Sequence, residues 1–118
     1  MCGIVGLFIK NPALESQLGA LVAPMLSEMT ERGPDSAGIA VYRNPQEDGC
    51  KITVLAQQQD FDWSTLEAAI SNHFSLRDIT VTRNHAVLCL DSAIEDVQDW
   101  MSDNWSDLSI TSAGTNIE

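Results

Sequence analysis

The sequence predicts an α+β fold, because strand and helix signals alternate along its 118 residues in two groups. The first group, residues 1–43, has the order strand, helix, strand. The second group, residues 51–112, has the order strand, helix, strand, strand, helix, strand, which is the order of the ferredoxin-like split β-α-β unit. With 44% apolar residues, the chain has enough material to bury a core without disulfides.

The first predicted strand is Met-Cys-Gly-Ile-Val-Gly-Leu-Phe, residues 1–8. Its Ile, Val, Leu and Phe side chains are typical of a strand buried on both faces, and Gly3 and Gly6 would let another segment approach closely. Cys2 directly follows the initiator methionine, so removal of Met1 would make it the N-terminal residue. Its thiol and free α-amine could then act as nucleophile and general base. The alternative is a structural strand in which Cys2 is a small apolar residue.

The predicted helix begins at Asn11, with Pro12 as its first residue, and ends near Glu31. Its apolar residues recur at helical spacing, and they are Leu14, Leu18, Leu21, Val22, Met25, Leu26 and Met29. Pro24 interrupts the hydrogen-bond ladder, so we expect a kink there. The next segment, Arg-Gly-Pro-Asp-Ser-Ala-Gly over residues 32–38, has the composition of a turn that ends a helix.

The remaining signals are strands separated by two short helices. Residues 38–43 form an apolar second strand of the first group. The predicted strands of the second group are residues 51–57, 77–83, 86–90 and 107–112. A capping box of Ser64 with Glu67 marks the start of the first helix of this group. A second box, Ser92 with Glu95, marks the start of the other. We expect the first and third strands in the centre of an antiparallel sheet, and both helices on one of its faces.

Acidic residues outnumber basic ones by seventeen to six, which gives a net charge of −11. Such a charge argues against binding to nucleic acid or to an anionic membrane surface. Several acidic residues lie along the last predicted helix, and no Lys or Arg follows Arg83. This acidic run is either a solvated face or a contact for a basic partner subunit.

The three cysteines, Cys2, Cys50 and Cys89, form no Cys-x-x-Cys pair, so they indicate neither a zinc site nor a disulfide framework. Cys50 and Cys89 lie at or within apolar segments, where a free cysteine packs as a small hydrophobic residue. This use of cysteine fits a reducing cytoplasm, and no apolar run has transmembrane length. We therefore expect a cytoplasmic protein without a bound metal.

Two motifs together, the Met-Cys-Gly-Ile start and the Arg-Gly-Pro-Asp-Ser segment that begins at Arg32, resemble the class II glutamine amidotransferases, which have an N-terminal nucleophile (Ntn). In that family such a start is followed, after one helix, by a segment of this type. The sequence most resembles the amidotransferase-like subunit of the glutamate synthase and N-methylglutamate synthase group, most specifically over residues 1–43. The resemblance implies the N-terminal half of an Ntn-hydrolase αββα sandwich. Residues 1–48 would belong to the amidotransferase domain, residues 49–112 would be an inserted ferredoxin-like subdomain, and residues 113–118 would return toward the first domain.

The resemblance also implies an activity, the hydrolysis of glutamine to glutamate and ammonia for a synthase partner. Cys2 would be the nucleophile, and Arg32 with Gly33 would shape the substrate pocket. Arg32 could equally be a cation beside the last carbonyls of the preceding helix. No cofactor motif occurs in the sequence, so FMN and iron-sulfur clusters of a synthase complex would lie on partner subunits.

The family's segments that bind the substrate carboxylate, form the oxyanion hole and hold the substrate amine do not occur in residues 1–118. We therefore expect this chain to be inactive alone, with exposed apolar side chains near Cys2 and Ile39. The alternative function is that of a non-catalytic relative, which would serve subunit assembly through its ferredoxin-like unit and acidic helix.

Overall fold

The computed structural model describes residues 3–33 and 35–118. They form two compact units, the first ending at residue 39 and the second covering residues 40–118. Together the units contain helices and one four-stranded sheet, so the predicted α+β class is confirmed. Among the described helices, none combines the length and the apolar character needed to cross a membrane.

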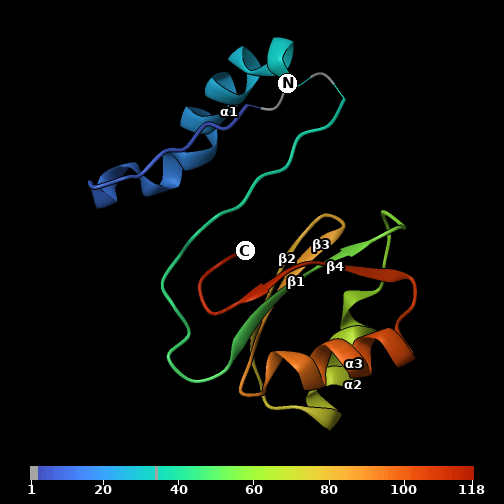
Figure 1. Ribbon diagram of the computed structural model, residues 1–118. Helices are drawn as coiled ribbons and strands as arrows, with labels where there is room; N and C mark the ends of the chain where they lie inside the picture. Colours follow the sequence, from blue (N-terminus) through green and yellow to red (C-terminus); the bar gives the residue numbers. More distant parts are fainter. Residues whose placement is uncertain (1–2, 34) are drawn as a thin grey trace. The chain divides into compact units, whose positions relative to one another are not determined.

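Among the described residues of the first unit, the regular elements are helical (Figure 1). A 3₁₀ helix, η1 (Pro12–Gln17), leads into α1 (Leu18–Glu28), and a further 3₁₀ turn, η2, covers Thr30–Arg32. The expected single helix is therefore divided into three segments, while α1 itself continues through Pro24.

The predicted helix start is confirmed. The side-chain oxygen of Asn11 accepts a hydrogen bond of 3.1 Å from the backbone nitrogen of Ala13, and Pro12 is the first helical residue. Proline is suited to this position because its missing N–H would have no partner within the helix.

The predicted strand over residues 1–8 is wrong for its described part, residues 3–8, which pair with no other strand. Ile4 and Phe8, expected to be buried, are 96% and 83% exposed. A strand requires a neighbour for its backbone groups, and the described residues supply none here. The expectation of exposed apolar side chains is confirmed at Ile4 and also at Ile39, which is 69% exposed.

The predicted strand over residues 38–43 is likewise absent as a regular ladder. Within it, only Tyr42 makes a β-bridge, which pairs it with Ile117. The prediction of a buried strand is therefore wrong, and the backbone of residues 41–46 instead bonds to residues 115–118.

The second unit has the predicted order of strands and helices (Figure 1). Its elements are β1 (Cys50–Ala56), α2 (Trp63–His73), β2 (Leu76–Thr82), β3 (His85–Leu90), α3 (Ile94–Asn104) and β4 (Leu108–Gly114). The strands form one sheet with the order β2-β3-β1-β4, and every neighbouring pair is antiparallel. The first and third strands are therefore central, as the predicted order of strands and helices required.

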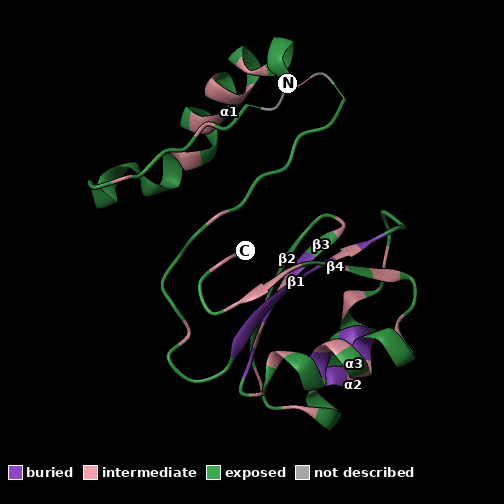
Figure 2. Cartoon of the chain, viewed as in Figure 1, coloured by how far each residue is buried: buried purple, intermediate pink, exposed green. Residues whose placement is uncertain are grey.

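The core of this unit lies between the sheet and both helices (Figure 2). Alternate residues of β1 and β3, including Ile52 and Leu88, form one buried cluster with Leu66 of α2 and Val97 of α3. Because successive side chains of a strand point to opposite faces, both helices must cover the same face of the sheet. That prediction is confirmed.

Both predicted capping boxes are wrong. Helix α2 is capped by Asp62, whose carboxylate accepts hydrogen bonds from the backbone nitrogens of Ser64 and Thr65 at 3.1 and 3.4 Å. Asp62 precedes Ser64 and reaches the first free amides, so the helix begins earlier than the box requires. Helix α3 begins after Ala93, with no side-chain cap, one residue later than a cap at Ser92 would place it.

Candidate active site

The structure brings Gly3 into contact with the end of the first helical region. A Cβ atom added to Gly3 would overlap the Cε atom of Met29 and lie 3.5 Å from Cβ of Arg32. Cys2, the predicted nucleophile, lies outside the described residues, but its neighbour Gly3 is packed against Arg32. Two motifs that are about thirty residues apart in the sequence thus meet within one unit.

Arg32 is the last residue of η2, and its side chain is exposed. Its backbone nitrogen donates to the carbonyl of Met29 at 2.9 Å, which fixes the main chain at this point. In the described part of the chain, no carboxylate lies within ion-pair distance of the guanidinium, and no carbonyl accepts a hydrogen bond from it. A guanidinium without such partners can bind the carboxylate of a ligand through two parallel hydrogen bonds.

Gly33 follows with an extended backbone, φ −155°, and its nitrogen donates to the carbonyl of Thr30 at 3.3 Å. No atom lies within 4 Å of the place where a Cβ would be. Any residue can adopt this conformation, so the backbone here does not require glycine. The open space does allow another molecule to approach the main chain closely.

The first unit leaves this candidate site open to solvent. None of the residues in η1, α1 or η2 is buried. Acyl-transfer sites exclude water to strengthen the electrostatic stabilisation of charge that develops during the reaction. This unit alone does not provide such an environment.

The other two cysteines are not activated. Burial raises the pKa of the Cys50 thiol, and burial likewise raises the pKa of the Cys89 thiol. A raised pKa keeps sulfur in the thiol form, which is a poor nucleophile. This agrees with the structural role that the sequence indicated for both residues.

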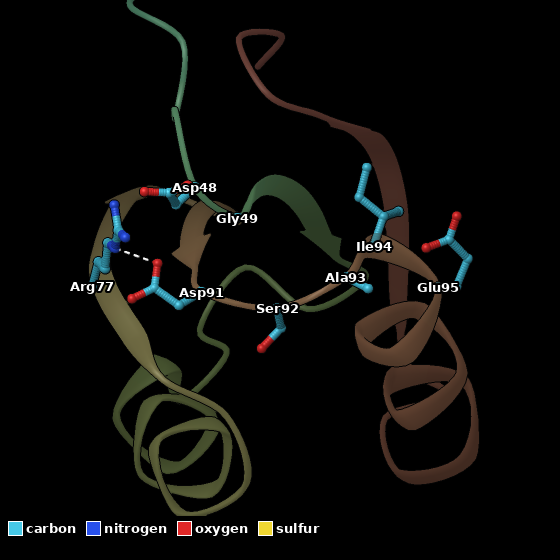
Figure 3. A pocket seen from close by; sticks show the side chains of 8 residues that line it. All are labelled: Asp48, Gly49, Arg77, Asp91, Ser92, Ala93, Ile94 and Glu95. Atoms are coloured by element: carbon cyan, nitrogen blue, oxygen red, sulfur yellow. Dashed lines mark ion pairs between the residues drawn. The ribbon is translucent and has the colours of Figure 1, made fainter.

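The second unit has a depression of about 550 Å³ at the start of α3, which the sequence did not indicate (Figure 3). Arg77 at the start of β2 forms an ion pair with Asp91, the residue after β3, and Asp48 lies on the same side of the depression. The hydrogen bond with Asp91 raises the pKa of Arg77. The pairing of Leu76 with Leu90, together with a backbone hydrogen bond of 2.9 Å from Asp91 to Ser75, brings Arg77 and Asp91 together, and this register cannot be read from the sequence.

The described residues contain no group of three or more His, Cys, Asp or Glu side chains arranged to hold a metal ion. Of the predicted site residues, the structure describes Arg32 and Gly33, and Cys2 lies outside the described residues. The structure adds Gly3 and Met29 as the residues that join the two segments of the candidate active site.

Comparison with known proteins adds two relatives. The chain is 39% identical, over 119 aligned positions that cover all of it, to the glutamine amidotransferase-like protein GlxB of Rhizobium meliloti strain 1021. It is 50% identical, over 42 residues or 36% of its length, to a putative glutamine amidotransferase of Methanothermobacter thermautotrophicus strain Delta H. No protein-family model and no solved structure matches the chain.

The chain spans about two fifths of the length of GlxB, since the alignment covers 40% of that protein, and it covers 13% of the archaeal relative. The likeness to GlxB nevertheless extends over both units of the present chain. The two comparisons therefore support a relationship of this chain to the glutamine amidotransferases.

Proposed function

We propose that these residues are the N-terminal part of a class II glutamine amidotransferase, which hydrolyses glutamine to glutamate and ammonia for a synthase partner of the glutamate synthase or N-methylglutamate synthase type. The observation that carries this proposal is the packing of Gly3, the residue after Cys2, against the aliphatic part of the exposed Arg32 side chain. The names of the two relatives support the same class of activity.

The proposed reaction begins after removal of Met1, which frees the α-amine of Cys2. The amine accepts the thiol proton while sulfur attacks the carboxamide carbon of glutamine. The carbon–nitrogen bond then breaks, the proton leaves with ammonia, and a thioester remains. Water attacks the thioester, which releases glutamate and restores the thiol. Arg32 would bind a substrate carboxylate, and the open backbone at Gly33 would let the substrate approach.

The second unit would be a ferredoxin-like subdomain inserted into the Ntn sandwich. An inserted subdomain requires the chain to enter and leave at nearby points. The pairing of Lys51 with Gly114 in the β1–β4 ladder supports this, because the two residues lie beside the proposed points of entry and exit. We accordingly assign residues 1–48 to the amidotransferase domain, residues 49–112 to the insertion and residues 113–118 to the return.

The test is a chimera in which the remaining sequence of GlxB follows residue 118, assayed for glutamine-dependent ammonia release beside the 118-residue chain. We expect the chimera to be active and its Cys2→Ala variant to lose at least about 100-fold in rate, because no other group supplies the nucleophile. Cys89→Ala is the matched control and keeps the activity, since its thiol is not activated. The 118-residue chain should release ammonia no faster than its own Cys2→Ala variant.

One observation favours a second function, that of a non-catalytic assembly module. The first unit exposes Ile4 and Phe8, which could pack against a partner subunit. An active chimera that is indifferent to Cys2→Ala would reject the proposed nucleophile. An inactive chimera that still binds a synthase subunit would favour the assembly module.

A further inference from the structure

Two segments that lie far apart in the sequence run side by side in the second unit. Residues 41–46 and residues 115–118 are joined by backbone hydrogen bonds of 2.8 to 3.1 Å. These bonds run from Val41 to Glu118, from Glu118 to Val41, from Arg43 to Asn116 and from Gln46 to Thr115. Tyr42 and Ile117 form a β-bridge within the same pairing. We call these two segments the clasp.

The side chain of Glu118 fastens the clasp to the sheet. Its Oε1 atom accepts a hydrogen bond of 2.7 Å from Nζ of Lys51, and its Oε2 atom lies 3.3 Å from Nε of Arg43. Lys51 belongs to the central strand β1, whereas Arg43 belongs to the clasp. A single carboxylate therefore connects both clasp segments to the centre of the sheet.

This ion pair is largely shielded from water. The side chain of Lys51 is 8% exposed and that of Glu118 is 18% exposed. Lys51 lies between Cys50 and Ile52, which face the helices, so its side chain points to the opposite face of the sheet. A buried ammonium group without a partner would be strongly unfavourable, and Glu118 supplies that partner.

Gly114 allows the chain to turn back into the clasp at the end of β4. A Cβ atom at this position would lie 2.7 Å from Cγ2 of Ile117, which is closer than Cβ contacts normally allow. The absence of a side chain thus lets Ile117 approach the strand and pair with Tyr42.

We infer that Lys51, Glu118 and Arg43 form a latch that holds the clasp closed and fixes the direction of the chain at residues 41 and 118. The clasp opens without unfolding of the sheet, because its own hydrogen bonds lie outside the four-stranded ladder. When it opens, the connection that leads to the first unit is released from the sheet. The latch is independent of the proposed amidotransferase activity.

Amide hydrogen exchange, followed by NMR on the full 118-residue chain, tests the latch. Lys51→Met removes the ammonium group and keeps much of the side-chain volume. We expect the amides of Val41, Arg43, Gln46 and Glu118 to exchange at least about tenfold faster. The amides between β1 and β3 should be unchanged. Arg77→Met is the matched control, because it breaks an ion pair outside the clasp and should leave the clasp amides unaffected.

Two results would overturn the inference. Unchanged exchange of the clasp amides in Lys51→Met would show that the ion pair does not hold the clasp. Equal acceleration of clasp and sheet amides would show that the clasp opens only when the whole unit unfolds. If Lys51→Met does not fold, Glu118→Gln replaces it as the test variant, because it removes the negative charge at nearly constant size. The inference then requires that Glu118→Gln accelerate exchange of the clasp amides and leave the sheet amides unchanged.

Discussion

The two units of the molecule contain similar apolar patterns and use them differently. In the second unit, Ile52, Leu66 and Leu88 come from different elements and are all fully buried in one core. In the first unit, the helical segments contain no buried residue, although the apolar side chains of α1 recur at helical spacing. An amphipathic pattern becomes a core only when a second apolar surface meets it.

This difference makes the second unit self-sufficient in packing, while the first depends on what its apolar side chains contact. Ile4 and Phe8 show this dependence in the first unit, since both are large, apolar and exposed. Mutations should therefore have unequal effects in the two units, which gives direct ways to test the comparison.

The largest expected effect is that of Leu88→Ala, which leaves a cavity between the sheet and the helices. We expect it to lower the free energy of unfolding by about 3 kcal/mol. Leu21→Ala, at a side chain that is 38% exposed in α1, should change it by less than about 0.5 kcal/mol. Urea denaturation followed by tryptophan fluorescence is the measurement, because Trp63, Trp100 and Trp105 all lie in the second unit. Equal effects of the two substitutions would mean that both units share one cooperative transition.

The cap of α2 should give a smaller effect that depends on pH. Hydrogen bonds from the hydroxyls of Ser64 and Thr65 lower the pKa of Asp62 to about 2, below its ordinary value of 3.8. Since the pKa is lower in the folded state, the ionised cap stabilises the unit fully above about pH 4, and this stabilisation is lost as the pH falls through about 2.

Asp62→Ala should lower the melting temperature by roughly 5 °C at neutral pH. The difference from the unchanged chain should shrink when melting is repeated toward pH 2. A difference that stays constant over this range would show that the charge of Asp62 does not contribute to the cap.

The smallest expected effect is a gain in stability at the turn between β2 and β3. Arg83 has a positive φ of 55°, which is unfavourable for a residue with a side chain. Arg83→Gly should raise the free energy of unfolding by about 0.5 kcal/mol, because relief of this strain exceeds the added flexibility of the unfolded chain. The indole nitrogen of Trp63 donates to the backbone carbonyl of Arg83, so this bond survives the substitution. A loss of stability in urea denaturation would show that the arginine side chain itself supports the turn.

The sequence motifs predicted some of the contacts in the molecule and missed others. Cys2, Arg32 and Gly33 were predicted from a resemblance in sequence, and the structure adds that Gly3 contacts Arg32. The pairing of Lys51 with Glu118 was not predicted. A lysine within an apolar strand was a usable sign that a buried partner exists, but the sequence contains seventeen acidic residues and does not show which one it is.

The sequence by itself determined the features that depend on neighbouring residues. These are the start of the helical region at Asn11, the types and order of the elements from β1 to β4, and the face on which α2 and α3 pack. Only the tertiary structure decided the features that need distant partners. Residues 3–8 form no strand because no described segment pairs with them. Arg77 contacts Asp91 because of the register between β2 and β3. Lys51 pairs with a carboxylate that lies 67 residues away in the sequence. Periodicity and capping act over a few residues, whereas strand pairing and charge burial require segments whose proximity only the folded chain establishes.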